Sequence, residues 1–391
     1  MTGSSLRTSV TNVRVMLSCG EISGDMYAGA LVHALRARNA NIEVFGLGGD
    51  CFAAAGGRLI GDFRGLTVTG LVEALRVLPD SYAMYRKLLQ AAERERPHVL
   101  VLIDYPDFNF RLMASVRRLD IPIVYYVSPQ LWAWRPRRIH NMKASVDRVL
   151  PIFPFEEPLY LREGLDVRFV GHPLIDLATS EISREQFLAG IDLTPAKPVV
   201  ALLPGSRPNE LQRLVPTIAA AVPRIASSVI GTQFVVARAP HLADSYFAPF
   251  QGVGAPVRIV EGQTDDVLAA SDVVITASGT ATVQAALHDK PMVVVYRLSP
   301  LTYKLGKPLL RVSTYSMVNL VAGERVVEEL IQDDCTPDAV AREAIDLLTN
   351  TDRVTRMKEQ LAIVREKLGG PGASGRAADA ILEVAERRGT V

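Results

Sequence analysis

The sequence predicts an α/β protein with two doubly wound, Rossmann-like domains, and three observations indicate this. The chain has 391 residues, more than a single hydrophobic core usually organises. Short apolar runs alternate with amphipathic segments, as expected for parallel strands covered by helices on both faces. The alternation is interrupted by a polar stretch near residues 171–197 and then starts again. We therefore expect domains at residues 1–180 and 181–391.

Apolar runs mark the expected strands of the first domain, and helical spacing at 25–38 and 70–96 marks two of the helices between them. These strands are expected at 13–19, 42–48, 98–105, 122–127 and 148–153. Those of the second domain are expected at 198–206, 232–237, 257–262, 272–279 and 291–297. From Glu324 onward the pattern is helical and ends in an amphipathic helix at 375–388. Two such domains facing one another across a cleft form the GT-B arrangement, although other two-domain α/β proteins fit the same pattern.

The composition is that of an ordinary globular protein and excludes several classes. Hydrophobic residues make up 48% and the net charge is +1, so nothing global favours nucleic acid as a partner. No apolar run approaches the roughly 20 residues that span a bilayer, and the N-terminus shows no export signal. Three widely spaced cysteines without a CxxC pair fit a reducing cytoplasm. No metal motif occurs, and we expect no cofactor.

Two polar motifs follow expected strands of the first domain. SCGEISGD places Gly20, Glu21, Ser23, Gly24 and Asp25 at a strand-to-helix junction. IDYPDFNF places Asp104, Asp107 and Asn109 just past another strand end. Carboxylates at strand ends favour general base chemistry on a polar substrate. The alternative is a structural role, with Ser23, Asp25 and Asp107 capping helices.

A basic and aromatic segment follows the 122–127 strand. It contains Trp132 and Trp134 among the cations Arg135, Arg137, Arg138, Lys143 and Arg148. This combination suits a phosphate-bearing lipid head group or an anionic membrane surface. Single-stranded nucleic acid is a competing ligand, and a solvated face over two core tryptophans is the structural alternative.

Leucines at helical spacing form a second candidate membrane surface. Leu71, Leu75 and Leu78 repeat along the helix expected from residue 70. Such a stripe usually belongs to the core, but it could also form an exposed apolar wall in a protein that handles lipids. The spacing alone does not separate the two.

Two glycine-containing turns in the second domain predict one nucleotide-diphosphate pocket. Gly205, Ser206 and Arg207 end one strand, and Ser278, Gly279 and Thr280 end another. Each turn leads into a helix, whose first N–H groups bind phosphate oxygens, and a guanidinium adds charge-assisted hydrogen bonds. Neither turn has Walker A spacing, so ATP is not the expected ligand.

In this order, SCGEISGD, IDYPDFNF, YYVSPQLWAW, FVGHPL, LLPGSR, ASGTAT, VVVYR and VNLVAGERVVEELIQ resemble the lipid-A-disaccharide synthase family from Ser18 to Gln332. The resemblance implies an inverting, UDP-sugar-dependent glycosyltransferase at the cytoplasmic face of the inner membrane. Its substrates would be UDP-2,3-diacylglucosamine and 2,3-diacylglucosamine 1-phosphate, which give a β-1,6-linked disaccharide 1-phosphate and UDP. It also implies a homodimer that exchanges C-terminal segments.

The resemblance assigns roles to individual residues. Asp107 would be the general base, with Glu21 and Asp25 as rivals, and Arg207 would bind the UDP phosphates. Asn319 and Glu324 would line the donor side, and the matched motifs extend the acceptor site to Ser128, Trp132 and Arg135. Relatives usually have glutamate where this chain has Gln284, and in related folds that acid binds the ribose.

Two other functions fit the same pattern. One is another UDP-GlcNAc-using enzyme of this fold, either a lipid-linked transferase or a 2-epimerase. The second is a non-catalytic protein that binds nucleotide sugars or membranes.

Overall fold

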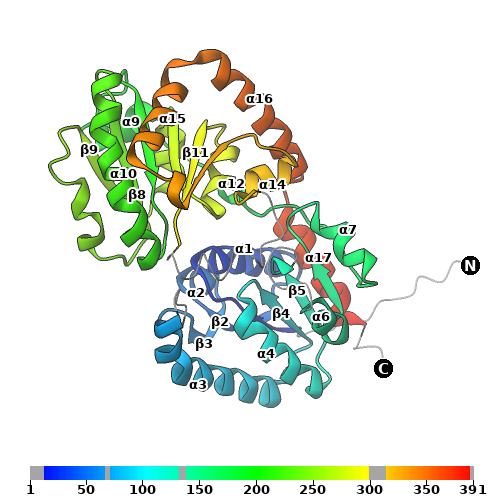
Figure 1. The fold of residues 1–391 in the computed structure, drawn as a ribbon. Helices are drawn as coiled ribbons and strands as arrows, with labels where there is room; N and C mark the ends of the chain where they lie inside the picture. The colour runs from blue at the N-terminus through cyan, green and yellow to red at the C-terminus, as the bar shows by residue number, and fades with distance from the viewer. Residues whose placement is uncertain (1–12, 67–70, 132–137, 299–313, 388–391) are drawn as a thin grey trace, which may run out of the picture. The chain divides into compact units, whose positions relative to one another are not determined.

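The computed structural model describes residues 13–66, 71–131, 138–298 and 314–387, with the side chains of 71–76 left out (Figure 1). They form two compact units. Unit 1 holds the residues up to Pro173 together with those from Gly370 onward, and unit 2 is the continuous segment Leu174–Gly369. The C-terminal segment therefore packs with the first part of the chain, whereas the expected division at residue 180 places it in the second domain.

Unit 1 contains a six-stranded parallel sheet in the order β3-β2-β1-β4-β5-β6. The strands are β1 Arg14–Ser18, β2 Glu43–Gly48, β3 Arg58–Asp62, β4 Val99–Ile103, β5 Ile123–Tyr126 and β6 Arg148–Leu150. The central strand β4, with the sequence VLVLI, is buried at every position. Such continuous burial is what helices on both faces of a parallel sheet require.

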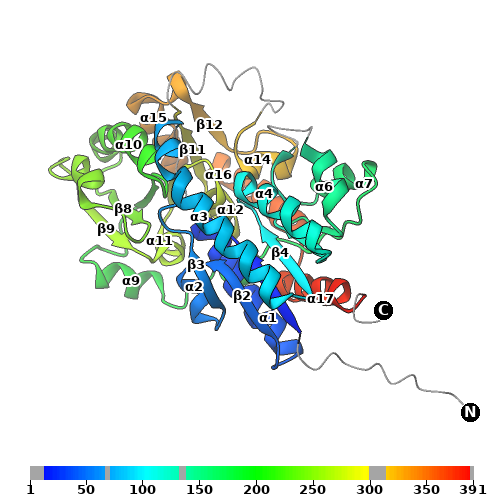
Figure 2. The same ribbon diagram turned by 90° about the horizontal axis from the view of Figure 1, so that it is seen from below.

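Helices cover both faces of this sheet (Figures 1 and 2). α3 (Leu71–Glu95), α4 (Pro106–Val116) and α6 (Ile139–Ser145) share one core with Met16, Leu100 and Tyr125 of the strands. α1 (Ile22–Arg38) and α17 (Ala373–Glu386) pack together on the other face, and α2 (Asp50–Ala54) lies against α1. α7 (Glu156–Arg162) follows the last strand.

Unit 2 repeats this topology. Its parallel sheet has the order β12-β11-β10-β7-β8-β9, which is the same order once the strands are numbered within the unit. The strands are β7 Val199–Leu203, β8 Gln233–Arg238, β9 Val257–Glu261, β10 Val273–Ala277, β11 Met292–Tyr296 and β12 Glu328–Ile331. The main helices are α9 Arg184–Gly190, α10 Pro208–Ser228, α11 Thr264–Ala270, α12 Thr280–Leu287, α14 Met317–Ala322, α15 Pro337–Thr349 and α16 Thr351–Lys367.

One core of unit 2 lies between the sheet and α10 and α15. Right-handed crossovers place α11 and α12 on the opposite face, because their connections run across the sheet in the other direction. Both units thus have the Rossmann-like architecture that the sequence predicts.

The sequence prediction missed two strands, β3 and β12. Both lie at an edge of their sheet and carry charged residues, with the sequences RLIGD and EELI. An edge strand is less enclosed than a central one, so it lacks the continuous apolar run that marks the others. The expectation that the chain is helical from Glu324 onward was therefore wrong at β12.

A buried arginine joins α17 to the sheet of unit 1. The Arg148 guanidinium donates to Asp166 at 3.0 Å, to Glu383 at 2.6 Å and to the carbonyl of Ala380. Its side chain is 7% exposed, so the expectation that it belongs to a basic membrane-facing surface was wrong. A second ion pair, between Arg38 and Asp379, joins α1 to α17.

Arg376 of α17 holds the two places where the chain passes between units. Its guanidinium donates to the carbonyls of Val170 at 2.8 Å, Gly370 at 2.7 Å and Pro371 at 2.6 Å. The outgoing and returning chain are therefore fixed at one point of unit 1.

We expect Glu383→Gln to lower the free energy of unfolding at pH 7 by about 1 kcal/mol, because Glu383 is half exposed and its pair with Arg148 is partly screened. The hydrogen bond from Arg148 holds the Glu383 pKa below its ordinary value, so its stabilisation is lost as the pH falls below about 4.5. Urea denaturation at pH 7 and pH 4 should show the gap between variant and wild type narrowing in acid. Glu93→Gln replaces an exposed glutamate of α3, and its free energy of unfolding should equal that of wild type at both pH values.

Candidate active site

The strand order of unit 1 reverses between β1 and β4. The chain leaves β1 for α1 on one face and β4 for α4 on the other, so a crevice opens at the carboxyl ends of these strands. Gly20 and Glu21 follow β1, and Asp104 and Asp107 follow β4. The structure therefore brings the two polar motifs of the first domain to one edge.

Asn109 joins the ends of these two strands. It is completely buried; its amide donates to the Asp104 carbonyl at 2.7 Å, and its Oδ1 accepts from Ser18 Oγ at 2.7 Å. Because its polar atoms bond to other groups of the protein, Asn109, which was predicted to contact the substrate, has a structural role.

The backbone at this edge is strained. Asp104 and Tyr105 have φ of +43° and +48°, and Val127 at the end of β5 has φ of +56°. Left-handed backbone is costly for residues other than glycine, above all for a β-branched one. The Asp104 N–H donates to the Val127 carbonyl at 3.1 Å, and the Tyr125 hydroxyl donates to the Asp104 carbonyl at 2.8 Å. Such enforced strain is typical of functional sites.

Tyr105 lies over Gly20 and beside the predicted bases. A Cβ on Gly20 would come within 2.2 Å of the Tyr105 ring, so only glycine fits there. Burial, together with the charges of Glu21 and Asp107, raises the pKa of Tyr105 to about 12. At neutral pH the phenol is therefore protonated, and it donates to the Leu66 carbonyl at 3.2 Å. Tyr105 lies within the IDYPDFNF motif, but the sequence alone did not indicate a role for it.

The three candidate bases have different surroundings. Asp107, in the first turn of α4, is 73% exposed and accepts from Arg138 at 2.5 Å. Asp25 is 4% exposed and accepts from the N–H groups of Gly49, Cys51 and Phe52 at 2.7–3.1 Å. It therefore caps α2, whereas the structural alternative from the sequence had Asp25 cap the helix at whose start it lies. Glu21 occupies the N-cap position of α1 and is partly buried.

The remaining acceptor-side predictions are only partly described. Ser23 and Gly24 lie in the first turn of α1, and Ser128 is buried just after β5. Trp132 and Arg135 lie outside the described residues, as do Trp134 and Arg137 of the same segment.

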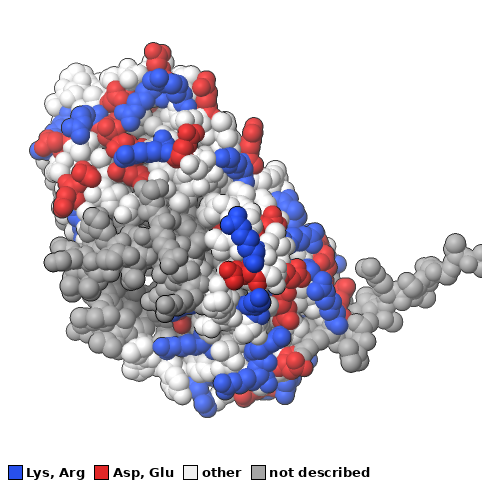
Figure 3. Space-filling model, turned by 45° about the vertical axis from the view of Figure 1, so that its right-hand side comes forward, with Lys and Arg blue, Asp and Glu red and all other residues white. Residues whose placement is uncertain are grey.

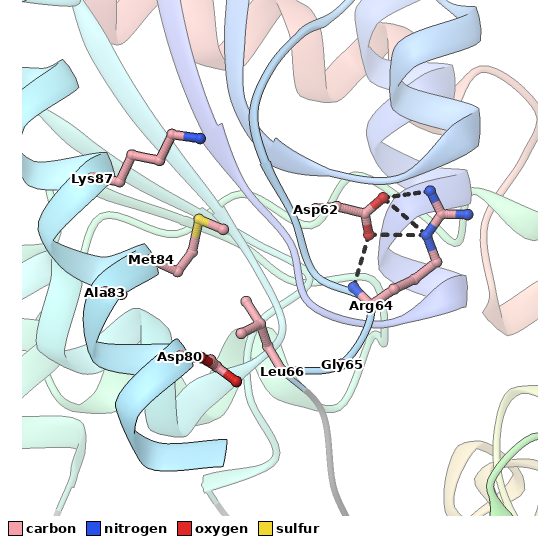
Figure 4. A pocket seen from close by; sticks show the side chains of 8 residues that line it. All are labelled: Asp62, Arg64, Gly65, Leu66, Asp80, Ala83, Met84 and Lys87. Atoms are coloured by element: carbon pink, nitrogen blue, oxygen red, sulfur yellow. Dashed lines mark hydrogen bonds and ion pairs between the residues drawn. The ribbon is translucent and has the colours of Figure 1, made fainter.

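A pocket of about 370 Å³ adjoins this edge, between the loop after β3 and α3 (Figure 4). Its wall combines the apolar Leu66 and Met84 with Asp80 and Lys87, and the Arg64 side chain is held by Asp62. Leu66, which lines this pocket, accepts a hydrogen bond from Tyr105 through its carbonyl, so the pocket wall contacts the strand-end residues. No sequence motif indicated it.

In unit 2 the strand order reverses between β7 and β10, where the two glycine turns lie. Gly205 has φ of +119°, and Arg207 is the N-cap of α10. The Glu210 carboxylate accepts from the Ser206 N–H at 3.2 Å and from Arg207 Nη1 at 3.3 Å. Two donors predicted to bind phosphate thus hold an internal carboxylate that is 15% exposed.

The turn after β10 is tied to the segment before α14. Ser278 Oγ donates to the Tyr315 carbonyl at 2.9 Å. Gly279 has φ of +150°, and Thr280 is the first residue of α12. Gln284, one helical turn further on, donates through Nε2 to Asp265 at 3.3 Å.

Asn319 and Glu324, the two residues predicted to line the donor side, differ in burial. Asn319 is 1% exposed, and its amide bonds the Val327 carbonyl and Glu329 while its oxygen accepts from the N–H groups of Val326 and Val327. These four bonds use its whole hydrogen-bonding capacity to shape the loop before β12. Glu324 is exposed in that loop.

Comparison with known proteins identifies the family. The family model described as Lipid-A-disaccharide synthetase matches residues 15–382. The chain belongs to this family. A lipid-A-disaccharide synthase of Myxococcus xanthus is 40% identical over 372 residues, covering 95% of this chain and 97% of the relative. Membership makes the chain a glycosyltransferase of lipid A biosynthesis, as the resemblance implied.

Solved structures share the fold at low identity. A UDP-GlcNAc 2-epimerase of Neisseria meningitidis bound to UDP-GlcNAc aligns with a TM-score of 0.69 and 14% identity, covering 95% of this chain and all of that one. The glycosyltransferase of kitacinnamycin aligns with a TM-score of 0.63 and 18% identity, covering 96% and 99%. Together with the two parallel sheets, these likenesses confirm the predicted GT-B class of fold and its helical C-terminal segment.

The contact of Glu210 with the turn at residues 205–207 leads to a prediction for the binding of UDP. Glu210→Gln should tighten the binding of UDP by roughly three- to tenfold if the turn binds the diphosphate, because a nearby anion is removed while one of the two acceptor oxygens stays. Arg207→Ala should weaken UDP binding by about 1.5–3 kcal/mol, since a charge-assisted bond is lost. Calorimetric titration measures both, and uridine, which has no phosphate, is the control ligand. Weaker UDP binding by Glu210→Gln would show that Glu210 mainly holds the turn in place.

Proposed function

We propose that the chain is a lipid-A-disaccharide synthase that transfers 2,3-diacylglucosamine from its UDP donor to 2,3-diacylglucosamine 1-phosphate. The products are a β-1,6-linked disaccharide 1-phosphate and UDP. The observation that carries this proposal is the family match over residues 15–382, which includes both strand-end sites. The differing chemistry of the two sites supports it.

Unit 1 takes the acceptor in this proposal. Asp107 removes the proton from the attacking sugar hydroxyl, because it is the most exposed of the candidate carboxylates and Arg138 fixes its orientation. Direct attack by that hydroxyl inverts the anomeric carbon. The pocket beside Tyr105 has polar and apolar walls, which suit part of an acylated sugar.

Unit 2 takes the UDP-sugar donor. The N-termini of α10 and α12 present backbone N–H groups at the same edge of the sheet, and Arg207 lies at the first of them. As the glycosidic bond to UDP breaks, negative charge grows on the diphosphate. These fixed donors stabilise that charge without a large rearrangement.

The test is incubation of the protein with both acylated glucosamine substrates, followed by detection of the disaccharide by mass. Asp107→Asn should lower kcat by roughly 100-fold or more, the usual scale for general base catalysis, and leave UDP affinity unchanged. Glu21→Gln is the matched comparison at the same edge. A larger loss in Glu21→Gln would assign the base to Glu21. Incubation with UDP-GlcNAc that gives UDP-N-acetylmannosamine, or free N-acetylmannosamine and UDP by hydrolysis, would instead indicate an epimerase.

We further propose that the protein lies on the cytoplasmic face of the inner membrane through the outer side of α3. Leu78 and Tyr82, one turn apart on this helix, are 46% and 60% exposed. Within the described part of the chain, no helix combines the length and apolarity needed to cross a bilayer. On the face shown in Figure 3, basic and acidic side chains are interspersed. The proposal rests on the exposed apolar residues of α3, and the basic segment around Arg135 to Lys143 adds an electrostatic attraction to anionic lipid. A homodimer also remains a proposal, which light scattering would test.

Leu78→Glu should reduce binding to anionic phospholipid vesicles several-fold, because burying a charge opposes insertion of the apolar face. Leu161→Glu is a matched control, since Leu161 is 53% exposed on α7. Raised salt should weaken vesicle binding without abolishing it, as screening affects only the electrostatic part. Co-sedimentation measures all three. Equal effects of both substitutions would argue against α3 as the membrane-facing surface.

A further inference from the structure

Two helices of unit 2 begin at the edge of the sheet where the glycine-containing turns at residues 205–207 and 278–280 lie. α11 follows β9 and α12 follows β10, and in a parallel sheet the carboxyl ends of all strands meet at that edge. Asp265 lies in the first turn of α11. Gln284 lies one turn into α12, and His288 is its C-cap. The two helices pack against each other, so these three side chains meet between them.

Asp265 is held from one side by two donors. Gln284 Nε2 lies 3.3 Å from its Oδ1 and 3.4 Å from its Oδ2, and His288 Nε2 lies 2.9 Å from Oδ1. A carboxylate only accepts, so the amide presents its NH₂ group and the imidazole its N–H. Most of this bonding falls on Oδ1. Asp265 keeps 23% of its side chain exposed, against 10% for His288.

The geometry points to Asp265 as the residue that accepts hydrogen bonds from the vicinal hydroxyls of the donor nucleotide's ribose, with Gln284 as its positioning residue. This inference rests on the proposed function, because it takes a UDP-sugar at this edge. Oδ2, which has only the 3.4 Å contact with Gln284, keeps acceptor capacity for neighbouring hydroxyls, and its negative charge makes it a stronger acceptor than the amide oxygen of Gln284. The site can therefore have an amide at position 284, because the carboxylate is supplied by Asp265 on the facing helix α11.

The contact also fixes what a charge at position 284 would do. A glutamate there would place a second carboxylate within hydrogen-bond distance of Asp265, and two such charges repel. The site thus accommodates one carboxylate, on either helix. If the carboxylate itself recognises the diol, moving it from α11 to α12 should preserve recognition.

The experiment compares UDP with 2′-deoxy-UDP by calorimetric titration into the full-length protein. Wild type should bind UDP about tenfold more tightly, because the deoxy ligand cannot donate the 2′-hydroxyl hydrogen bond to the charged acceptor. Asp265→Asn should reduce this ratio to about twofold, and it should weaken 2′-deoxy-UDP less than UDP, because the deoxy ligand keeps only the 3′-hydroxyl as a donor. Gln284→Glu should weaken both ligands by carboxylate repulsion. The double variant Asp265→Asn/Gln284→Glu should regain a ratio near that of wild type.

Asp266→Asn is the matched control, since Asp266 lies in the same turn but accepts from Ser180 at 2.7 Å. Thermal melts show whether each variant folds, and a purely structural network would change melting temperature without changing the ligand ratio. An unchanged ratio in Asp265→Asn, or a double variant that fails to regain it, overturns the inference. The proposed function fails separately, if wild type binds no UDP or forms no disaccharide.

Discussion

Both units depend on one topological constraint, the reversal of strand order at the middle of each sheet. At the reversal, consecutive helices leave neighbouring strands toward opposite faces, so neither helix covers the strand ends. The exposed edge must then be closed by the chain itself. In unit 1 the buried Asn109 amide closes it by joining the ends of β1 and β4. In unit 2 the turns after β7 and β10 lie there, each formed around a glycine of positive φ.

The two edges share a topology but differ in chemistry. Unit 1 presents carboxylates beside a tyrosine whose raised pKa keeps it neutral, on a backbone held in left-handed conformations. Unit 2 presents backbone N–H groups, a guanidinium and few negative charges, apart from acids already held by internal donors. One edge is suited to removing a proton and the other to binding a leaving anion. In the proposed reaction this difference, more than the shared fold, separates the role of unit 1 from that of unit 2.

The sequence predicted those features that are encoded locally. Buried strands such as β4 are continuous apolar runs, and glycines and acids just after them mark the functional edges. The partners of the acids were not predictable, because Asp25 meets Gly49 and Gln284 meets Asp265 only through the tertiary fold. These contacts decide whether a carboxylate is exposed or already bonded. The edge strands β3 and β12 escaped prediction because their sequences are too polar to mark a buried strand.

The return of the C-terminal helix to unit 1 has a consequence for biosynthesis. Unit 2 is continuous in sequence, so its fold does not depend on α17, whereas unit 1 is complete only when α17 is present. Without that helix Arg148 has no Glu383, and the face of the first sheet that α17 shares with α1 is only partly covered. The part of the chain made first is thus finished last. A chain that lacks α17 would therefore have all of the second unit and an incomplete first one.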